Sequence, residues 1–453
     1  MSQVYLDSNA TGANDGTSEA DAYTDVRTAL SGLTFGDTLW VKNSGATYGI
    51  TMGSRIDMTP LLDIGSSPED NQYIKIKGYS GTTGDKPTGN DRPVISKLTN
   101  GVPQIVIEFP QGLICENIIF DTPYQTYTTS YSDFSFNALN RFKNCKFIAR
   151  DPGASITSGG WAYSIGGNSY FYGCEFDFQV TTSNASSRSA PFMNSGGHTY
   201  FKDCVFKSIA DSPPIMQGDN SYPSDSIHDC IFIGNGNNDG YYLDIADQGG
   251  QFKSAYYNKL TNNIFYNLGN AINIIPPYSV NSAADTESEW ASAAERIKVT
   301  NCIFENCLTG VKVDTYTEPS GWVTGVFRMG HVTKVEDCAF YNMTTANTSG
   351  ELMEDGTINL SASPFVDAPN NDFSINEIAG AGKIIREQSG NEISILDGAS
   401  TFKFFAGAKL EKDFRTTDTG SLSLGTGGVG DTVNVSGKAF QLVQDNPRVW
   451  RWT

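Results

Sequence analysis

The sequence predicts an all-β fold, a parallel β-helix, from three observations. A four-residue phrase recurs eight times through the middle of the chain. Its copies lie 26 to 39 residues apart, as from Cys204 to Cys230 and from Asn263 to Cys302. The local sequence pattern is therefore kept while the repeat length varies. That combination is typical of a stacked solenoid with loops of variable length. Only 18% of the 453 residues are charged and 46 are glycine, which fits many turns and few helices.

The phrase itself predicts a corner followed by a strand. Position one is Asn, Asp or Gly in every copy, and these residues tolerate left-handed backbone or cap a turn. Positions two and four are mostly small-apolar and aromatic, and in a strand they share one face. Position three varies freely, as expected for the outward face. The copies are Asn117–Phe120, Asn144–Phe147, Gly173–Phe176, Asp203–Phe206, Asp229–Phe232, Asn262–Phe265, Asn301–Phe304 and Asp337–Phe340. We therefore expect one inward column of phenylalanines with a column of cysteines beside it.

The cysteines are expected to be free thiols. Six of the eight occupy position two of the phrase. Neighbours in such a column are one strand spacing apart, about 4.8 Å, and a disulfide between them would be strained. We therefore expect reduced thiols and a chain that folds in a reducing cytoplasm. No Cys-x-x-Cys occurs, and the sequence predicts no metal site and no cofactor.

The two ends of the chain differ from the coil. Residues 1–34 contain a strand and one amphipathic helix, for which Thr24 is the expected N-cap. We expect this helix to close the open end of the core, as a solenoid requires. The coil is assigned to residues 35–382. Residues 383–453 read as short strands between Gly-rich turns, beginning at Ile384-Ile385, and predict a small all-β domain for assembly or attachment.

The last residues of the chain carry two tryptophans, Trp450 and Trp452. Exposed tryptophans at a chain end are costly in water unless they dock on something. A contact within a core or with another subunit is the preferred interpretation, which makes both tryptophans candidate assembly residues. A ligand site is the alternative.

The charge and hydropathy of the chain limit the kinds of partner that it is expected to bind. The net charge of −19 argues against nucleic acid, because phosphate binding needs clustered Lys and Arg. A polyanionic polysaccharide would be repelled at long range, although a local basic groove could still bind one. No apolar run of 18 residues occurs, so no membrane insertion is expected. The N-terminus shows no signal peptide, and we expect a protein that is not exported by the usual route.

Short segments outside the repeats carry a resemblance to a known superfamily. They are Tyr5–Ser8, Gly12–Gly16, Asp21–Tyr23, Gly36–Val41, Ser363–Asp367 and Asn371–Phe373. The first four resemble the opening, and the last two the closing motif, of right-handed parallel β-helix proteins of the pectate-lyase-like superfamily. The resemblance spans roughly residues 3–382 and implies a right-handed coil. It says little about activity, because this fold hosts many functions.

The combination of coil, expected free thiols, absent leader and added C-terminal β-domain resembles bacteriophage virion proteins, namely tailspikes and head decoration proteins. That resemblance implies a non-enzymatic virion protein, a homotrimer folded in the host cytoplasm, whose partners are other virion proteins and host-surface glycans. A typical tailspike has an N-terminal particle-binding domain, whereas here the coil starts within the first residues. Attachment is therefore expected through the C-terminal domain or a face of the helix.

The alternative interpretation is a polysaccharide depolymerase, either a glycoside hydrolase or a lyase. Two carboxylates about 5 to 9 Å apart can hydrolyse a glycosidic bond. The candidate catalytic residues are Asp239, Asp244, Asp247 and Glu318. Flat aromatic side chains in the same half suit sugar rings, although they also anchor protein interfaces. The candidate glycan-binding residues are Tyr241, Tyr242, Tyr278, Trp290, Tyr316 and Trp322. Polygalacturonase-type hydrolases combine an Asp-Asp pair, a His-Gly and an Arg-Ile-Lys; the sequence has no Asp-Asp pair and none of its three histidines precedes a glycine. Arg296-Ile297-Lys298 matches the third motif, but it opens a repeat strand and is interpreted as a coincidence. A bacterial surface adhesin is a third interpretation, which the missing leader disfavours.

Overall fold

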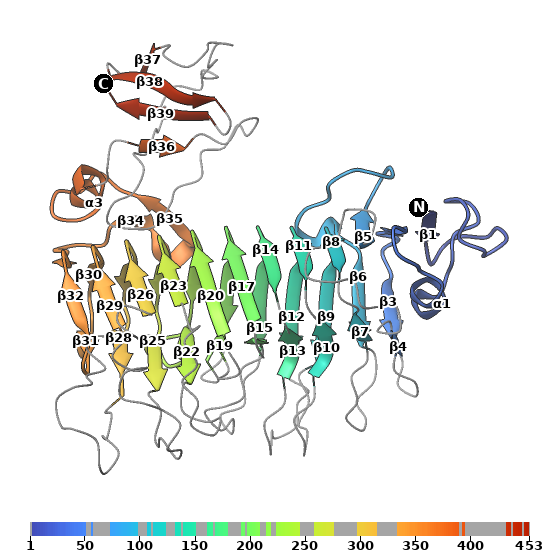
Figure 1. Cartoon of the computed structure of the whole chain (residues 1–453), viewed down its shortest axis with the longest axis horizontal. Coiled ribbons are helices and arrows are strands. Elements are labelled where there is room, and N and C mark those ends of the chain that lie inside the picture. The colour runs from blue at the N-terminus through green and yellow to red at the C-terminus, as the bar shows by residue number, and fades with distance from the viewer. Residues whose placement is uncertain are drawn as a thin grey trace, which may run out of the picture.

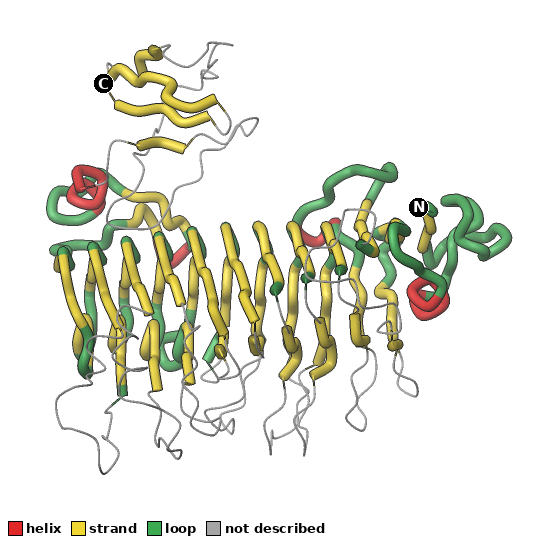
Figure 2. Tube along the Cα trace, viewed as in Figure 1, coloured by secondary structure: helices red, strands yellow, loops and turns green. Residues whose placement is uncertain are grey.

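The computed structural model shows a coil of parallel strands around one continuous hydrophobic core (Figure 1). Three long sheets, A, B and C, run along the coil, and each turn adds one strand to each of them (Figure 2). The fold is therefore a parallel β-helix, as predicted. The structure describes residues 2–50, 56–57, 73–97, 107–109, 112–123, 132–136, 139–150, 161–165, 168–179, 192–194, 197–208, 214–218, 223–244, 258–275, 297–314, 333–388, 392–394, 432–435, 438–445 and 448–452.

Within these residues the sheets have 12, 11 and 10 strands. Sheet A contains β1 (Gln3–Leu6), β2 (Thr38–Lys42), β5 (Ile74–Tyr79), β8 (Leu113–Glu116), β11 (Asn140–Lys143), β14 (Ser169–Tyr172), β17 (Gly197–Lys202), β20 (Pro223–His228), β23 (Asn258–Thr261), β26 (Ile297–Thr300), β29 (Thr333–Glu336) and β32 (Met353–Asp355). Sheet B contains β3 (Thr47–Ile50), β6 (Val94–Lys97), β9 (Ile119–Pro123), β12 (Lys146–Arg150), β15 (Glu175–Gln179), β18 (Val205–Ser208), β21 (Ile231–Ile233), β24 (Ile264–Tyr266), β27 (Ile303–Glu305), β30 (Ala339–Tyr341) and β33 (Ile358–Asn359). Sheet C contains β4 (Ile56–Asp57), β7 (Ile107–Phe109), β10 (Ser132–Phe136), β13 (Trp161–Ile165), β16 (Phe192–Asn194), β19 (Met216–Gly218), β22 (Tyr241–Asp244), β25 (Asn270–Ile275), β28 (Thr309–Val313) and β31 (Ala346–Ser349).

The predicted corner lies between sheets A and B. Position one of the phrase has left-handed backbone in all eight copies, with φ from 51° at Asn144 to 59° at Asn117 and Gly173. Asn and Asp are the residues that, besides Gly, adopt this conformation at low cost. The Asn144 side chain also donates to Asn117 Oδ1 at 2.8 Å, which ties one corner to the next. The corner prediction is confirmed.

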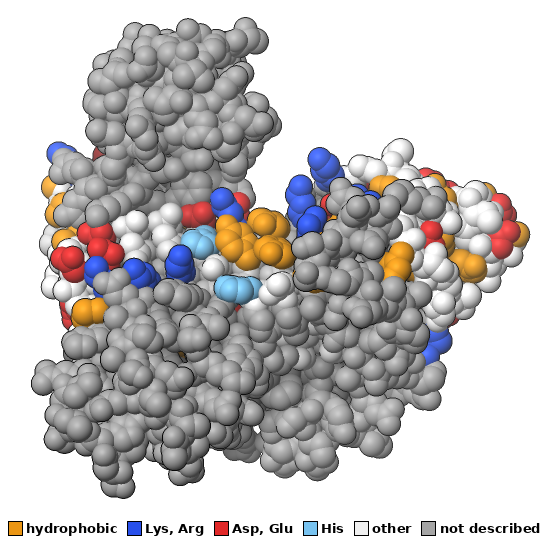
Figure 3. Space-filling view, in the orientation of Figure 1, with side chains coloured by type: hydrophobic (Ala, Val, Ile, Leu, Met, Phe, Trp, Pro, Cys, Tyr) orange, Lys and Arg blue, Asp and Glu red, His pale blue; other side chains and the backbone are white. Residues whose placement is uncertain are grey.

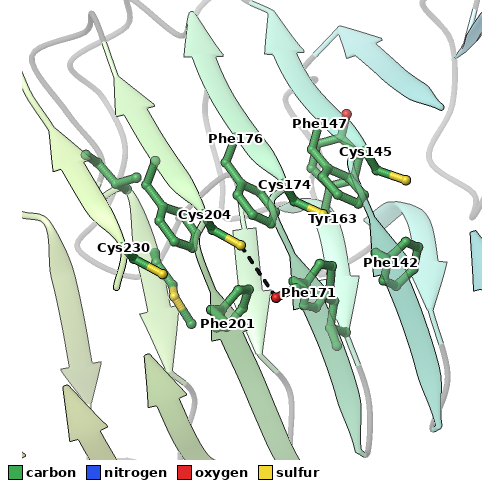
Figure 4. Close-up of a cluster of buried hydrophobic side chains, with 14 of the residues drawn as sticks. Phe142, Cys145, Phe147, Tyr163, Phe171, Cys174, Phe176, Phe201, Cys204 and Cys230 are labelled. Carbon is green, nitrogen blue, oxygen red and sulfur yellow. Dashed lines mark hydrogen bonds between the residues drawn. The ribbon is translucent and has the colours of Figure 1, made fainter. Parts of the chain in front are cut away.

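The phenylalanines of position four form one stacked column inside the coil (Figure 4). Phe176 and Phe206 lie 4.5 Å apart with rings 6° from parallel, and Phe206 and Phe232 repeat that geometry at 4.5 Å and 7°. The column extends from Phe120 to Phe340, and all eight rings are at most 1% exposed. The parallel register places each ring directly on its equivalent in the next strand.

All eight cysteines are free and buried, as predicted. Figure 4 shows several of the thiols beside the phenylalanine column. Burial raises the pKa of the Cys204 and Cys338 thiols well above its ordinary value, so they act as small apolar groups. Asn263 takes the place of a cysteine in one turn and is fully buried. Its amide accepts from Cys230 N and donates to Ile227 O, both at 2.9 Å, so no buried polar group is left unpaired there.

The N-terminal helix α1 (Val26–Ser31) closes the coil, as expected. Its apolar face is buried in the same core as the first strands of the coil. The expected N-cap is wrong by one residue. Asp25, not Thr24, has the extended backbone of a cap, and its carboxylate accepts from Thr28 N at 2.8 Å.

Residues 360–388, here named the C-terminal arm, cover the outer face of sheet B near the end of the coil. The arm contains the hairpin β34 (Phe365–Asp367) and β35 (Asp372–Ile375), with a short 3-10 helix, Ala368–Asn370, between its strands, followed by α3 (Gly382–Gln388). Its side chains form a second core with the outward residues of sheet B. The outward position three is therefore buried at Ile264, Ile303 and Ala339, where free exposure was expected. The strand expected at Ile384-Ile385 is part of α3 instead.

Four further strands form a small antiparallel sheet in the order β36-β39-β38-β37. They are β36 (Glu392–Ser394), β37 (Thr432–Val435), β38 (Lys438–Asp445) and β39 (Arg448–Trp452). Trp450 pairs with Leu442 and Trp452 with Phe440 across β38 and β39. Strand signals at 402–405 and 422–424 lie outside the described residues.

We predict that Phe206→Ala lowers the free energy of unfolding by about 3 to 5 kcal/mol, the usual cost of truncating a buried Phe. The reason is that this ring stacks on a neighbour at both faces. Urea unfolding followed by circular dichroism measures the change. Val205→Ala, on the outward side of the same strand, is the matched control and is expected to cost less than half as much. Equal losses in the two variants would contradict the stacked column as the main source of core stability.

Candidate functional site

The outer face of sheet A carries the candidate site. Because strands alternate sides, two outward residues precede each corner, at one and three positions before position one of the phrase. The register stacks these residues into two columns along the coil. We name the stretch from β11 to β29 the basic-aromatic face. Its outward residues include Arg141, Lys143, Tyr170, Tyr172, His198, Tyr200, Lys202, Ser226, His228, Lys259, Thr261, Lys298, Thr300, Lys334 and Glu336.

Positive charge is concentrated on this face. Among the outward positions just named, six are Lys or Arg and one, Glu336, is a carboxylate, although the whole chain has a net charge of −19. Glu336 lies 3.3 Å from Lys334. By contrast, Lys143, Lys202 and Lys259 make no ion pair with any residue that the structure describes. Their charges are therefore available to a ligand.

An aromatic strip crosses the middle of the face. Tyr170 and Tyr172 are 37% and 41% exposed, unusual for side chains of this size in the described structure. The Tyr200 ring lies 6.3 Å from Tyr170 and 5.7 Å from Tyr172, and 5.4 Å from the His228 ring. In Figure 3 a hydrophobic patch lies next to two histidines, with a row of Lys and Arg beside them. Flat rings of this kind stack on apolar surfaces while their hydroxyls stay wet.

The surroundings shift the pKa values of two groups on the strip in opposite senses. Burial, and then the charges of Lys202 and Lys259, lower the pKa of His228 below its ordinary value of 6.5. Burial, and then Tyr172, raise the pKa of Tyr200 to about 12. At pH 7 the imidazole is therefore neutral and the phenol protonated. His228 therefore adds no positive charge to the six Lys and Arg side chains of the face at pH 7.

This arrangement suits the binding of anionic, ring-containing molecules. Ammonium and guanidinium groups bind carboxylates or sulfates, while the tyrosine rings accept apolar ring faces. In the described part of the chain, no group of three or more His, Cys, Asp or Glu residues could hold a metal ion. None of the described helices is long and apolar enough to cross a membrane.

Of the predicted catalytic carboxylates the structure describes Asp239 and Asp244, and neither belongs to a strand of sheet A. Asp239 accepts hydrogen bonds from Asn270 N and Nδ2, both at 2.9 Å, and from Asn273 Nδ2 at 2.7 Å. These bonds tie one turn of the coil to the next, so the structure gives Asp239 a structural role. Asp244 is the last residue of β22. Asp247 and Glu318 lie outside the described residues.

The structure describes two of the predicted glycan-binding aromatic residues, Tyr241 and Tyr242. Tyr241 is fully buried and its hydroxyl donates to Asp225 Oδ2 at 2.7 Å, so it is a core residue and its selection as a surface residue was wrong. Tyr242 points to the other side of β22 but is only 6% exposed. The remaining four lie outside the described residues, namely Tyr278, Trp290, Tyr316 and Trp322.

The residues of the basic-aromatic face were missed at the sequence level, although a signal was present. Extending each phrase by three residues gives Arg-Phe-Lys before Asn144, Tyr-Phe-Tyr before Gly173 and Tyr-Phe-Lys before Asp203. A buried ring between two polar or aromatic residues marks an outward–inward–outward strand. Aligning those outward positions across the turns would have shown the basic column.

No family model matches the chain. No curated protein matches it either. Among solved structures it is similar to one described as the crystal structure of pectate lyase Pel9A, with 12% sequence identity and a TM-score of 0.45. The likeness covers 91% of this chain and 97% of that chain. The parallel β-helix described above rests on the sheet order and register of this chain itself.

A buried carboxyl group away from the basic-aromatic face also has a strongly shifted pKa. Glu305 points outward from β27 under the C-terminal arm and is 3% exposed. Ser363 Oγ donates to its Oε2 at 2.9 Å, and no Lys or Arg of the described residues pairs with it. Burial raises the pKa of Glu305 to about 7. The carboxyl group is buried in the protonated form far more readily than as an anion.

We predict that docking of the C-terminal arm weakens as the pH rises through about 7. The pKa of Glu305 is raised in the folded chain, so its contribution is complete below about 4.5 and is lost through the folded value. Hydrogen exchange of the β35 amides at pH 6 and pH 8, corrected for intrinsic rates, measures the change. Glu305→Gln is expected to keep these amides protected at pH 8, because glutamine mimics the neutral carboxyl group.

The control for this prediction is Glu351→Gln, since Glu351 is exposed and lies shortly before the C-terminal arm in the sequence. It is expected to leave the pH dependence of β35 unchanged. A wild-type chain equally protected at both pH values would contradict the prediction.

Proposed function

We propose that this chain binds an acidic polysaccharide along the basic-aromatic face of sheet A. The observation that carries the proposal is the segregation of six Lys and Arg and three tyrosines on one outer face of an otherwise acidic chain. Sugar rings offer apolar C–H faces to tyrosine, and their carboxylate or sulfate groups offer anions to lysine.

The repetition of the face favours a polymer over a small ligand. Strands in a sheet are about 4.8 Å apart, so the seven strands from β11 to β29 span about 29 Å in six spacings. A chain molecule lying along the coil would meet cationic or aromatic side chains at six of those seven strands. Several weak contacts on one polymer add up in the manner of linked sites.

A nucleic acid fits the overall charge less well. Its binding depends on neutralising many phosphates, and a net charge of −19 opposes the approach of so dense a polyanion. Polysaccharides with an acid on only some of their sugars carry a lower charge density. The tyrosine rings form an uncharged surface, and the lysines around them are separated from one another. This arrangement matches the lower charge density of such polysaccharides.

The proposal is compatible with the predicted virion protein that contacts host glycans. Location in a virion, the homotrimer and the assembly role of Trp450 and Trp452 stay predictions of the sequence. The depolymerase stays the alternative function. The structural bonds of Asp239 argue against its role as a hydrolytic carboxylate, and the burial of Tyr241 argues against its role in glycan binding.

We predict that Lys202→Glu weakens binding of a polyuronate such as alginate by at least about tenfold, or about 1.4 kcal/mol. The substitution places a negative charge at the centre of the face, where Lys202 has no ion-pair partner among the described residues. Isothermal titration calorimetry at low and high salt measures the affinity. From physiological to high salt, wild-type binding is expected to weaken, since the attraction between the face and the ligand is screened.

Lys207→Glu is the matched control, because it makes the same charge change at an outward position of β18 in sheet B, away from the face. It is expected to alter the affinity by less than about twofold, a negligible free-energy change. Neutral dextran is the control ligand. Equal losses in both variants, or dextran bound as tightly as alginate, would contradict the proposal.

The predicted homotrimer can be tested by light scattering of the full chain and of a chain that ends after Gln388. The shortened chain must retain α3, because Ile385 is part of the second core. A trimeric full chain and a monomeric shortened chain are expected if residues after 388 mediate assembly. Two monomers would show that the trimer prediction is wrong.

A further inference from the structure

Three residues on adjacent strands form the centre of the basic-aromatic face. His228 on β20 is directly opposite Lys202 on β17 in the parallel register. On the other side, Lys259 of β23 is paired with Ser226, two residues before His228, and so lies diagonally across from it. The imidazole therefore lies between two lysines that have no ion-pair partner among the described residues.

The remaining groups around His228 are also defined. Tyr200 packs against its ring at 5.4 Å, and Tyr172 lies beyond Tyr200. The neighbouring carboxylates are those of the corners, Asp203 and Asp229, each directly after the strand that carries Lys202 or His228. On β23, Thr261 is directly opposite His228 and carries no charge. Among the described residues, the two lysines are the charges that act on the pKa of His228, and the corner carboxylates are its acidic neighbours at the strand ends.

In the free protein the two lysines oppose protonation of His228. Burial lowers its pKa first, and the charges of Lys202 and Lys259 lower it further. A third positive charge at this point therefore costs free energy as long as no anion is present. An anion held between the lysines would remove that cost and give the imidazolium an acceptor.

We propose that Lys202, His228 and Lys259 form a proton-linked subsite for one carboxylate or sulfate group of the bound polysaccharide. The inference rests on the proposed acidic-polysaccharide function. In the free chain His228 is neutral; when the anion binds, the imidazole takes up one proton from solvent and donates it in a hydrogen bond to the ligand. The neighbouring tyrosines then hold the ring of the same or the next sugar.

The direction of the pH effect follows from linkage. Because the bound state holds more protons than the free state, affinity rises as the pH falls, by at most about tenfold per pH unit between the free and bound pKa values. Carboxylates of uronic acids and sulfate esters stay ionised over that range. A change in affinity between pH 8 and pH 5.5 therefore reports on the protein and not on the ligand.

The experiment is titration calorimetry of the full chain with alginate as the carboxylate probe and dextran sulfate as the sulfate probe. Titrations at pH 6.5 in two buffers of different ionisation enthalpy give the number of protons taken up. We expect uptake of a substantial fraction of one proton per bound subsite, and an affinity at least about threefold higher at pH 5.5 than at pH 8. A preference for one probe identifies the anion.

Two variants separate the subsite from a structural role. His228→Asn is expected to abolish the proton uptake and, with it, the rise in affinity from pH 8 to pH 5.5. Lys202→Met is expected to raise the pKa of His228 in the free protein, measured by NMR, because it removes one repelling charge. Lys207→Met, which removes a charge on the outer side of sheet B, is the control and is expected to retain the uptake.

The outcomes are distinguishable. If neither probe binds at any pH, or if a single-stranded polynucleotide binds more tightly than both at equal salt, the proposed function fails and the subsite with it. If alginate or dextran sulfate binds but no proton is taken up, the subsite is wrong while the proposed function stands. Uptake that persists in His228→Asn, or an unchanged pKa of His228 in Lys202→Met, also overturns the subsite alone.

Discussion

At each of the eight phrase copies the chain passes from sheet A to sheet B through one residue with φ between 51° and 59°. That corner fixes where the next side chain enters the core, and therefore which residues of both flanking strands point inward. With the corner in place, Phe206 must lie over Phe176, and the thiol of Cys204 must follow that of Cys174. A one-residue slip would turn every side chain of a strand to the other face, so the corner and the core select the same register.

The same register organises the outer surface. Alternate residues of each strand in sheet A point inward and outward. The register that stacks the inward phenylalanines therefore also stacks the outward residues into columns along the outside of the sheet. A solenoid therefore turns a short local pattern into an extended surface. Where the outward positions hold Lys or Tyr in consecutive turns, the surface becomes a row of like groups. The proposed binding face is a consequence of the stacking and requires no special loop.

The sequence was sufficient for features that repeat in every turn. The corner, the column through Phe120 and Phe340, and the buried thiols all follow from residue types at fixed offsets. It was insufficient where a distant segment changes a surface, because position three is outward by local rules but is covered at Ile303 by the C-terminal arm. A hint was present, since this position changes from Lys146 and Glu175 to apolar residues in the later turns. The role of Asp239 depends on partners one turn away, which spacing alone does not provide.

The apparent conflict between an acidic chain and a polyanionic ligand is resolved by the range of electrostatic forces. At physiological ionic strength charges are screened over about 8 Å, which is less than two strand spacings. A ligand on sheet A therefore experiences Lys143, Lys202 and Lys259 directly, whereas carboxylates elsewhere on the molecule are largely screened. Net charge controls the long-range approach, and the local face controls the bound state. Lowering the salt strengthens both the attraction by the face and the repulsion by the rest of the chain. Binding to this face is therefore expected to be tightest at intermediate ionic strength, a salt profile that a uniformly basic protein would not give.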